Sequence, residues 1–448
     1  MTTTLFKNYT QLVDNGETPI VRKKRKDALD ILTAAVAAVN PYTAVRRVFA
    51  EQQIVVEKNV FDLSHFDHIY VVGFGKASIG MAQAVVDSIP VTKGIVITND
   101  PSVHIQNPVM EVIVGGHPLP NKDSVHGTEK ILDLIAQCGE HDLLLVLISG
   151  GGSALLCKSR INLHDAQKTT ELLLKSGAGV KEINTVRKHL SLVKGGQLIT
   201  HAKGVVVSLV LSDIVQDPLE FIASGPTCPD STTFADAKEV LERYQLWEKM
   251  PSEVKRVITE GINGEIPETP KKGDPVFNQA YCVVVGNNRL ACTSALEEAK
   301  NLGYDARILS TSISGEARTV GTNLVTTILK EGKHDRDVVV IIGGETTVSV
   351  RGKGVGGRSQ EIVLGCIEVL SDTEMVFASL ATDGIDGNST GAGALADGFS
   401  LSRAQKKGLL PSSFLEENNS HEFFMSLGDV LCTGPTGTNV MDLQVLIF

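Results

Sequence analysis

The chain has 448 residues, 42% of them hydrophobic and 21% charged, with a formal net charge of −10 at pH 7. The apolar content is sufficient for a sizeable core, and the length predicts more than one domain. The acidic balance argues against nucleic acid or an anionic membrane as main partner. Seven scattered cysteines without a CxxC pair predict neither a zinc site nor a disulfide framework. With no apolar run of about 18 residues, we expect a cytoplasmic protein.

Apolar runs alternate with helical patterns over the first half of the chain. The spacing of Leu29, Leu32 and Val36 predicts a helix over residues 27–39. Further helices are predicted over 79–86, 124–135 and 163–174, and strands over 67–72, 94–98, 142–148 and 205–211. Alternation of strands and helices predicts βαβ units and a mostly parallel sheet.

A second α/β series follows a segment that is rich in proline, glycine and charge, residues 261–278. Its predicted strands are 281–285, 306–309, 337–342 and 375–380. We therefore predict an α/β protein with an N-terminal domain over 1–262, a linker over 263–278 and a C-terminal domain over 279–448. Because ligands bind beyond the carboxyl ends of parallel strands, the active site is expected in a cleft between the domains.

One glycine turn carries most of the chemical information. Residues 143–148 (LLLVLI) are continuously apolar, as in a buried parallel strand, and end in Ser149-Gly150-Gly151-Gly152-Ser153. Successive glycines expose backbone N–H groups, and a helix that begins there would favour an anion. The turn therefore predicts binding of a phosphorylated or carboxylated ligand, unless it is only a tight strand-to-helix connection.

Two further glycine-rich segments carry cations. Gly75 and Lys76 follow a predicted strand, and a lysine in such a turn suits a transferring phosphate, although a surface lysine is the simpler reading. Residues 352–357 fit GxGxxG literally but lack the acidic residue of a dinucleotide site. We interpret this segment, which includes Gly356 and Gly357, as a mobile loop that brings Arg358 to the ligand.

Four carboxylates stand where predicted strands end: Asp213, Glu345, Asp383 and Asp386. Hard oxygen ligands in such positions suit Mg²⁺ bound together with substrate phosphates, and one of them could accept a hydroxyl proton. Each also has an ordinary interpretation as a turn or helix-capping residue.

A basic segment over 181–196 could bind a substrate carboxylate, with Arg187 as the planar fork and Lys188 beside it. On composition alone, a solvent-exposed helix face is equally consistent. Asn287 lies in another strand-end turn, over residues 286–289.

In this order, these turns resemble the glycerate 2-kinase family, over roughly residues 25 to 448. The matching segments are 73–77 (GFGKA), 149–155 (SGGGSAL), 181–196, 211–213 (LSD), 223–226 (ASGP), 343–346 (GGET), 356–361 (GGRSQE), 381–387 (ATDGIDG) and 436–442 (TGTNVMD). The resemblance implies an N-terminal Rossmann-like domain and a C-terminal domain of the MOFRL type.

The resemblance further implies phosphorylation of D-glycerate at its 2-hydroxyl by ATP with Mg²⁺. A homodimer is our candidate for the oligomeric state. It implies Lys76 and Arg358 as catalytic cations, with Asp213 as the third catalytic candidate. The candidate ligand-binding residues are Gly75, Ser149, Gly150, Gly151, Gly152, Ser153, Arg187, Lys188, Asn287, Gly356 and Gly357. Two alternatives remain at this point: a hydroxypyruvate reductase that uses NAD(P)H, and a non-catalytic nucleotide-binding module.

Overall fold

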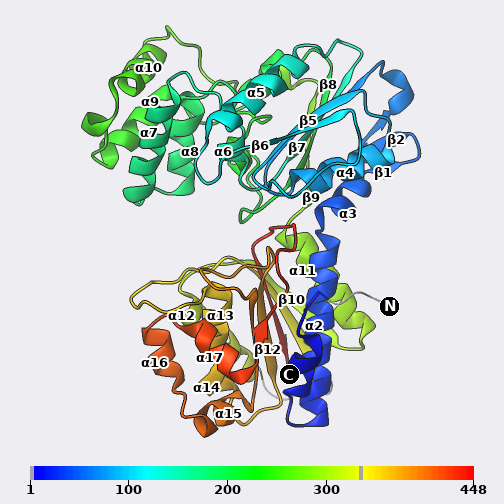
Figure 1. Ribbon diagram of the computed structural model, residues 1–448, viewed down its shortest axis with the longest axis vertical. Coiled ribbons are helices and arrows are strands. Elements are labelled where there is room, and N and C mark those ends of the chain that lie inside the picture. Colours follow the sequence, from blue (N-terminus) through cyan, green and yellow to red (C-terminus); the bar gives the residue numbers. More distant parts are fainter. Residues whose placement is uncertain (1–4, 332–336) are drawn as a thin grey trace. The chain divides into compact units, whose positions relative to one another are not determined.

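The structure is a computed structural model that describes residues 5–331 and 337–448. The chain divides into two compact units (Figure 1). Unit 1 comprises residues 1–40, 213–216 and 286–448, and unit 2 comprises residues 41–212 and 217–285. No helix among the described residues is long and apolar enough to cross a membrane.

Unit 2 is built on a six-stranded sheet with the strand order β6-β5-β4-β7-β8-β9, in which the pairs from β6 to β8 are parallel. Its strands are β4 (Ile69–Phe74), β5 (Lys93–Thr98), β6 (Met110–Val114), β7 (Leu143–Ile148), β8 (Val205–Leu211) and β9 (Ala280–Gly286). Every residue of β4 and β7 is buried, which explains why these central strands read as unbroken apolar runs.

Helices α4 (Ser78–Ser88) and α5 (Lys122–Ile135) pack on this sheet. Figure 1 shows a group of helices at one end of unit 2, with a small antiparallel sheet at the other. The remaining elements of the unit are α3 (Pro41–Arg46), β1 (Phe49–Ala50), β2 (Gln53–Val56), β3 (Asn59–Asp62), α6 (Gly152–Leu155), α7 (Leu163–Lys175), α8 (Val180–His189), α9 (Phe234–Arg243) and α10 (Ser252–Ile262).

Unit 1 has a mixed six-stranded sheet with the order β10-β11-β15-β12-β13-β14. Only β10 and β11 are parallel, because the C-terminal strand β15 lies antiparallel between β11 and β12. The second α/β series of the sequence therefore forms a mixed sheet. Its strands are β10 (Asp305–Ile313), β11 (Val338–Gly344), β12 (Val376–Ala381), β13 (Gly393–Asp397), β14 (Val430–Leu431) and β15 (Asp442–Ile447).

Helices cover both faces of this sheet, with α2 and α11 on one face and α13 on the other (Figure 1). The helices of unit 1 are α1 (Tyr9–Asp14), α2 (Pro19–Ala38), α11 (Asn288–Asn301), α12 (Ala317–Leu329), α13 (Arg358–Leu364), α14 (Ile367–Leu370), α15 (Ser400–Lys406), α16 (Pro411–Glu416) and α17 (Ser420–Leu427).

The division into units differs from the predicted boundaries, because residues 1–40 and 213–216 belong to unit 1 and residues 263–285 belong to unit 2. The N-terminal helix α2 belongs to unit 1, where the fully buried Arg25 forms ion pairs with Asp397 and Asp429 at 2.6 and 2.8 Å. The predicted linker over 263–278 lies within unit 2, anchored where Thr269 donates a hydrogen bond to buried Asp230 at 2.9 Å. Proline, glycine and charge are common to linkers and to surface loops of this kind.

Candidate functional site

Two of the predicted glycine turns lie side by side in unit 2. Strands β4 and β7 are parallel neighbours, so the turns that follow them meet at one edge of the sheet. The Lys76 N–H donates to the Gly150 carbonyl at 2.8 Å, and the Ala77 N–H donates to Ser149 Oγ at 3.1 Å. Gly75 has φ +134°, and a Cβ there would lie 2.1 Å from Ser149 Oγ. Only glycine permits this close approach of the two turns.

A helix is expected after the glycine turn that begins at Ser149. This helix, α6, has only four residues. Its dipole is therefore small, and several backbone N–H groups of the turn form hydrogen bonds within it, among them that of Gly152 to Ser149. Attraction for an anion must come mainly from side chains nearby.

Basic side chains gather around this turn. A Cβ on Gly151 would lie 3.3 Å from Lys76 Cγ and 3.1 Å from His117 Cδ2. Burial, followed by the charges of Lys76 and Arg187, lowers the pKa of His117. These groups therefore lie within electrostatic range of one another. We call Lys76, His117, Arg187 and Lys194 the cation cluster.

Lys194 is the most buried member of the cation cluster. Its Nζ donates to the carbonyls of Ser153 and Leu156, both at 2.7 Å, and is thereby fixed against α6. Burial, with Arg187 adding to it, lowers the pKa of Lys194 to about 7. An ammonium group has three N–H donors, so one of them remains beyond these two carbonyls.

Within the described part of the chain, none of the four side chains in the cation cluster forms an ion pair with a carboxylate. Arg187 and Lys194 also line a small cavity of about 30 Å³, together with Ser153, Cys157, Thr169 and Thr170. Space of that size accommodates small polar groups and no nucleotide. Several cations without a counter-ion are typical of a site whose negative charge arrives with the ligand.

The structure separates Arg187 from Lys188, although the two were predicted to act together. They are adjacent in α8 and so point about 100° apart around the helix. Lys188 is fully buried, with its Nζ 3.1 Å from Asp230 Oδ1 and 4.9 Å from the centre of the Phe221 ring. Its charge is balanced within the fold.

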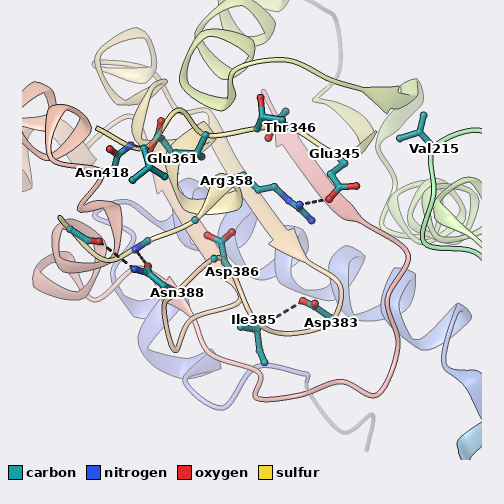
Figure 2. Close-up of a pocket in the computed structure, with 17 residues that line it drawn as sticks. Val215, Glu345, Thr346, Arg358, Glu361, Asp383, Ile385, Asp386, Asn388 and Asn418 are labelled. Carbon is teal, nitrogen blue, oxygen red and sulfur yellow. Dashed lines mark hydrogen bonds and ion pairs between the residues drawn. The ribbon is translucent and has the colours of Figure 1, made fainter. Parts of the chain in front are cut away.

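In unit 1, Arg358 stands at the start of α13 and forms ion pairs with two carboxylates, of which Figure 2 shows that of Glu345. Its Nε donates to Asp442 Oδ2 at 2.6 Å and its Nη2 to Asp442 Oδ1 at 3.1 Å, which is a two-pronged ion pair. Its Nη1 pairs with Glu345. Burial raises the pKa of Asp442 to about 7, against the lowering effect of Arg358. The pKa of Arg358 is raised by Asp442 and Glu345, although burial opposes this.

Asp386 forms the N-terminal cap of α13. Its Oδ1 accepts from the Ser359 N–H at 2.9 Å, and its Oδ2 accepts from the Gln360 N–H at 2.8 Å and from Gln360 Nε2 at 2.9 Å. Burial raises the pKa of Asp386 to about 6 despite these donors. A Cβ on Gly357 would lie 2.3 Å from Asp386 Oδ1, so glycine is needed for this cap.

The glycine-rich loop before Arg358 is held by side chains along its length. The Gly352 N–H donates to Asn418 Oδ1 at 3.0 Å and the Gly356 N–H to Asn388 Oδ1 at 2.9 Å. A Cβ on Gly356 would meet Ser420 Oγ at 2.2 Å. The interpretation of this segment as a mobile loop differs from the structure, in which the glycines permit close packing.

A cavity of about 800 Å³ lies beside Arg358 in unit 1 (Figure 2). Its lining combines loop glycines and the apolar Val348, Val350 and Ile385 with the polar Thr346, Asp383 and Asn388. The volume and the mixed lining match those of sites for nucleotide-sized ligands.

The predicted magnesium ligands are not gathered into one cluster. Among the described residues, no group of three or more His, Cys, Asp or Glu side chains is arranged to hold a metal ion. Glu345, Asp383 and Asp386 line the cavity beside Arg358, but Asp386 is occupied by its three donors. Asp213 is half-buried after β8. Asn287, a predicted ligand-binding residue, caps α11 by accepting from the Leu290 N–H at 2.8 Å.

Family models match two parts of the chain. Residues 27–259 match a domain of unknown function, DUF4147, and residues 338–442 match the MOFRL family. The chain therefore belongs to the family of two-part proteins that these domains define, and the α/β class and the family predicted from the sequence are confirmed.

Relatives from several organisms resemble the chain over nearly its whole length. A glycerate 2-kinase of Pyrococcus horikoshii is 40% identical over 94% of this chain and 97% of its own. A D-glycerate 2-kinase of Thermotoga maritima is 38% identical with the same coverage. A protein of Agrobacterium vitis with the provisional name of a hydroxypyruvate reductase is 36% identical, over 91% of this chain and 95% of its own.

Two solved structures share the fold. A crystal structure of a Pyrococcus horikoshii protein matches with a TM-score of 0.85 at 39% identity, over 94% of this chain and 98% of the other. The crystal structure of a Thermotoga maritima glycerate kinase matches with a TM-score of 0.84 at 35% identity, over 94% and 99%.

The sequence interpretation missed three residues of these sites: His117, Lys194 and Asp442. Lys194 and Asp442 stand inside the segments 181–196 and 436–442, which resemble the family, but nothing in their local pattern marks them as ligand-facing. His117 follows β6, an edge strand that the sequence did not reveal.

Proposed function

We propose that the protein is a glycerate 2-kinase. In this reaction the 2-hydroxyl oxygen of D-glycerate forms a bond to the γ-phosphorus of ATP, and the bond from that phosphorus to the β–γ bridging oxygen breaks. The products are 2-phosphoglycerate and ADP, and the hydroxyl proton passes to a base or to water. The names of the relatives support this activity. The observation that carries it within the structure is the cation cluster without a carboxylate partner.

Unit 2 supplies the site for the acid. D-glycerate carries a carboxylate, and after transfer it also carries a phosphate. Its negative charge would therefore balance the positive charge of the cation cluster. Arg187 offers a planar fork for the carboxylate, and Lys194 has a remaining donor beside the small cavity that both residues line. Lys76, in the glycine turn, would stabilise the negative charge of the phosphoryl group during transfer.

Unit 1 supplies the site for the nucleotide. The cavity beside Arg358 has a suitable volume, and Arg358 is held rigidly by Asp442 and Glu345 at its edge. A guanidinium that is fixed in advance stabilises phosphoryl charge without reorganisation during the reaction. We therefore propose Arg358, beside Lys76, as the second cation that acts on the phosphoryl group, on the basis of its fixed guanidinium.

Magnesium fits part of the predicted set of carboxylates. Glu345 and Asp383 are half-buried at the cavity and are hard oxygen donors, and one or two carboxylates together with phosphates are the usual protein contribution to a Mg²⁺ site. When bound, Mg²⁺ neutralises charge on the phosphate oxygens. Asp213 remains our proposal for the group that accepts the hydroxyl proton.

The experiment is an assay of the purified protein with D-glycerate, ATP and Mg²⁺, with the product identified by ³¹P and ¹³C NMR. We expect formation of ADP only when D-glycerate is present, and a phosphate on carbon 2. A phosphate on carbon 3 would contradict the regiochemistry. Oxidation of NADH by hydroxypyruvate without use of ATP would replace the kinase by the reductase.

A further inference from the structure

A chain of three buried or half-buried polar side chains leads away from the small cavity in unit 2. Ser153 Oγ lies 2.8 Å from Ser224 Oγ, and Ser224 Oγ donates to Asn184 Oδ1 at 2.9 Å. Asn184 Nδ2 donates to the Phe221 carbonyl at 3.3 Å. The three residues come from α6, α8 and the turn over 222–224. We call them the serine relay.

The serine relay has a fixed direction. The Phe221 carbonyl can only accept, so it holds the Asn184 amide with its NH₂ toward Phe221 and its oxygen toward Ser224. The single proton of the Ser224 hydroxyl is then used on Asn184. Ser224 Oγ can therefore only accept from Ser153, and the Ser153 proton points away from the cavity. What Ser153 offers to a ligand is its oxygen, as an acceptor.

The backbone that carries Ser224 is strained and packs closely against the glycine turn. Ala223 and Ser224 have φ of +50° and +64°, and Gly225, which follows, has φ of +58°. Left-handed conformations are disfavoured for residues with a side chain and concentrate at functional sites. The strained turn contacts the glycine turn directly, since a Cβ on Gly152 would lie 2.7 Å from Ala223 Cβ. Ser224 is thereby held against Ser153.

We infer that Ser153 accepts a hydrogen bond from the glycerate hydroxyl that is not phosphorylated, the 3-hydroxyl, and that Ser224 and Asn184 are positioning residues for it. This inference rests on the proposed function. The relay ends in an amide, which cannot take up a proton, so Ser153 is suited to hold a hydroxyl and not to deprotonate one. Arg187 and Lys194 line the same cavity as Ser153, so a carboxylate and a hydroxyl are recognised together.

The test compares D-glycerate with D-lactate, which keeps the carboxylate and the 2-hydroxyl but lacks the 3-hydroxyl. We expect wild-type kcat/KM to favour D-glycerate strongly. Ser153→Ala and Ser224→Ala should each lower kcat/KM for D-glycerate about tenfold and leave D-lactate within about twofold, the effect of one lost hydrogen bond. The inhibition constant of D-lactate against D-glycerate gives the same comparison through binding.

The ratio of the two kcat/KM values does not depend on how much of the enzyme is folded, so a merely structural role cannot change it. Ser208→Ala is the matched control, because Ser208 is also buried in unit 2 and its Oγ has no partner among the described residues. Its ratio should equal that of the wild type. An unchanged ratio in both relay variants would overturn the inference. Failure of the wild type to phosphorylate D-glycerate would instead contradict the proposed function.

Discussion

The cations of the two units are held in opposite ways. In unit 1, Arg358 stands between Asp442 and Glu345, and both partners come from its own unit. In unit 2, Lys76, Arg187 and Lys194 lie near one another without any carboxylate partner in the described part of the chain. A paired cation contributes to the fold and is preorganised, whereas clustered unpaired cations oppose folding and are compensated when an anion binds.

This comparison predicts opposite effects of substitution on stability, with loss of activity in both units. The largest effect on turnover is expected for Lys76→Met. Because Lys76 has no carboxylate partner, the variant should keep or slightly raise the melting temperature, while kcat falls about 10²-fold or more. Melting curves and steady-state kinetics check this, with exposed Lys203→Met as control. A rise in KM at unchanged kcat would make Lys76 a residue of ground-state binding.

Arg358→Met should lose most turnover as well, but it should also destabilise the protein. It leaves the buried Asp442 without its partner, and we expect a loss of about 1–3 kcal/mol in the free energy of unfolding. Adding Asp442→Asn should recover much of that stability without restoring turnover. Denaturant unfolding of both variants measures this. Equal stability of Arg358→Met and the wild type would show that the ion pair does not support the fold.

Removal of metal should abolish the activity, and the carboxylates of unit 1 should set the requirement for Mg²⁺. Asp383→Asn should raise the Mg²⁺ concentration for half-maximal activity about tenfold, on the scale of losing support at a metal site. Glu345→Gln should raise this concentration as well, and it should also lower kcat because it removes an ion-pair partner of Arg358. Glu374→Gln, at an exposed position of the same unit, serves as control. An unchanged requirement in both variants would remove them from the metal site.

The smallest effect concerns the protonation of Lys194. Its pKa is lowered to about 7 in the native protein. At a pH between about 7 and the ordinary pKa of lysine, the unfolded chain therefore binds a proton that the native protein does not. In this range the free energy of unfolding rises with pH. An anion beside Lys194 reverses the shift. Binding of D-glycerate at pH 8 should therefore take up as much as one proton. Calorimetry in two buffers of different ionisation enthalpy measures this uptake, which Lys194→Met should remove. His117, whose pKa is lowered from its ordinary value, should add to this uptake only at lower pH.

The sequence was most informative where one local rule decided the structure. β4, β7 and β8 are continuous apolar runs that end in glycine or polar turns, and they lie within two residues of the predicted ranges. Parallel strands end at the same edge of a sheet, so the pattern placed Lys76 and the turn over 149–153 at one edge, whereas the pairing of β4 with β7 was not predicted.

Long-range pairing could not be predicted in the same way. β15 lies in the middle of the sheet of unit 1 although it is the last strand of the chain, and so Asp442 meets Arg358 across 84 positions of sequence. The serine relay joins residues 153, 184 and 224 from three elements. Local composition does not predict such pairings, because they depend on how the elements pack.

The central claim is that the unpaired cations of unit 2 hold the acid substrate. A crystal structure of the protein with D-glycerate tests it most directly. We predict density for the carboxylate at Arg187 and Lys194, with one hydroxyl at Ser153. D-glycerate bound in the cavity of unit 1 beside Arg358, with the cation cluster left without it, would contradict the account.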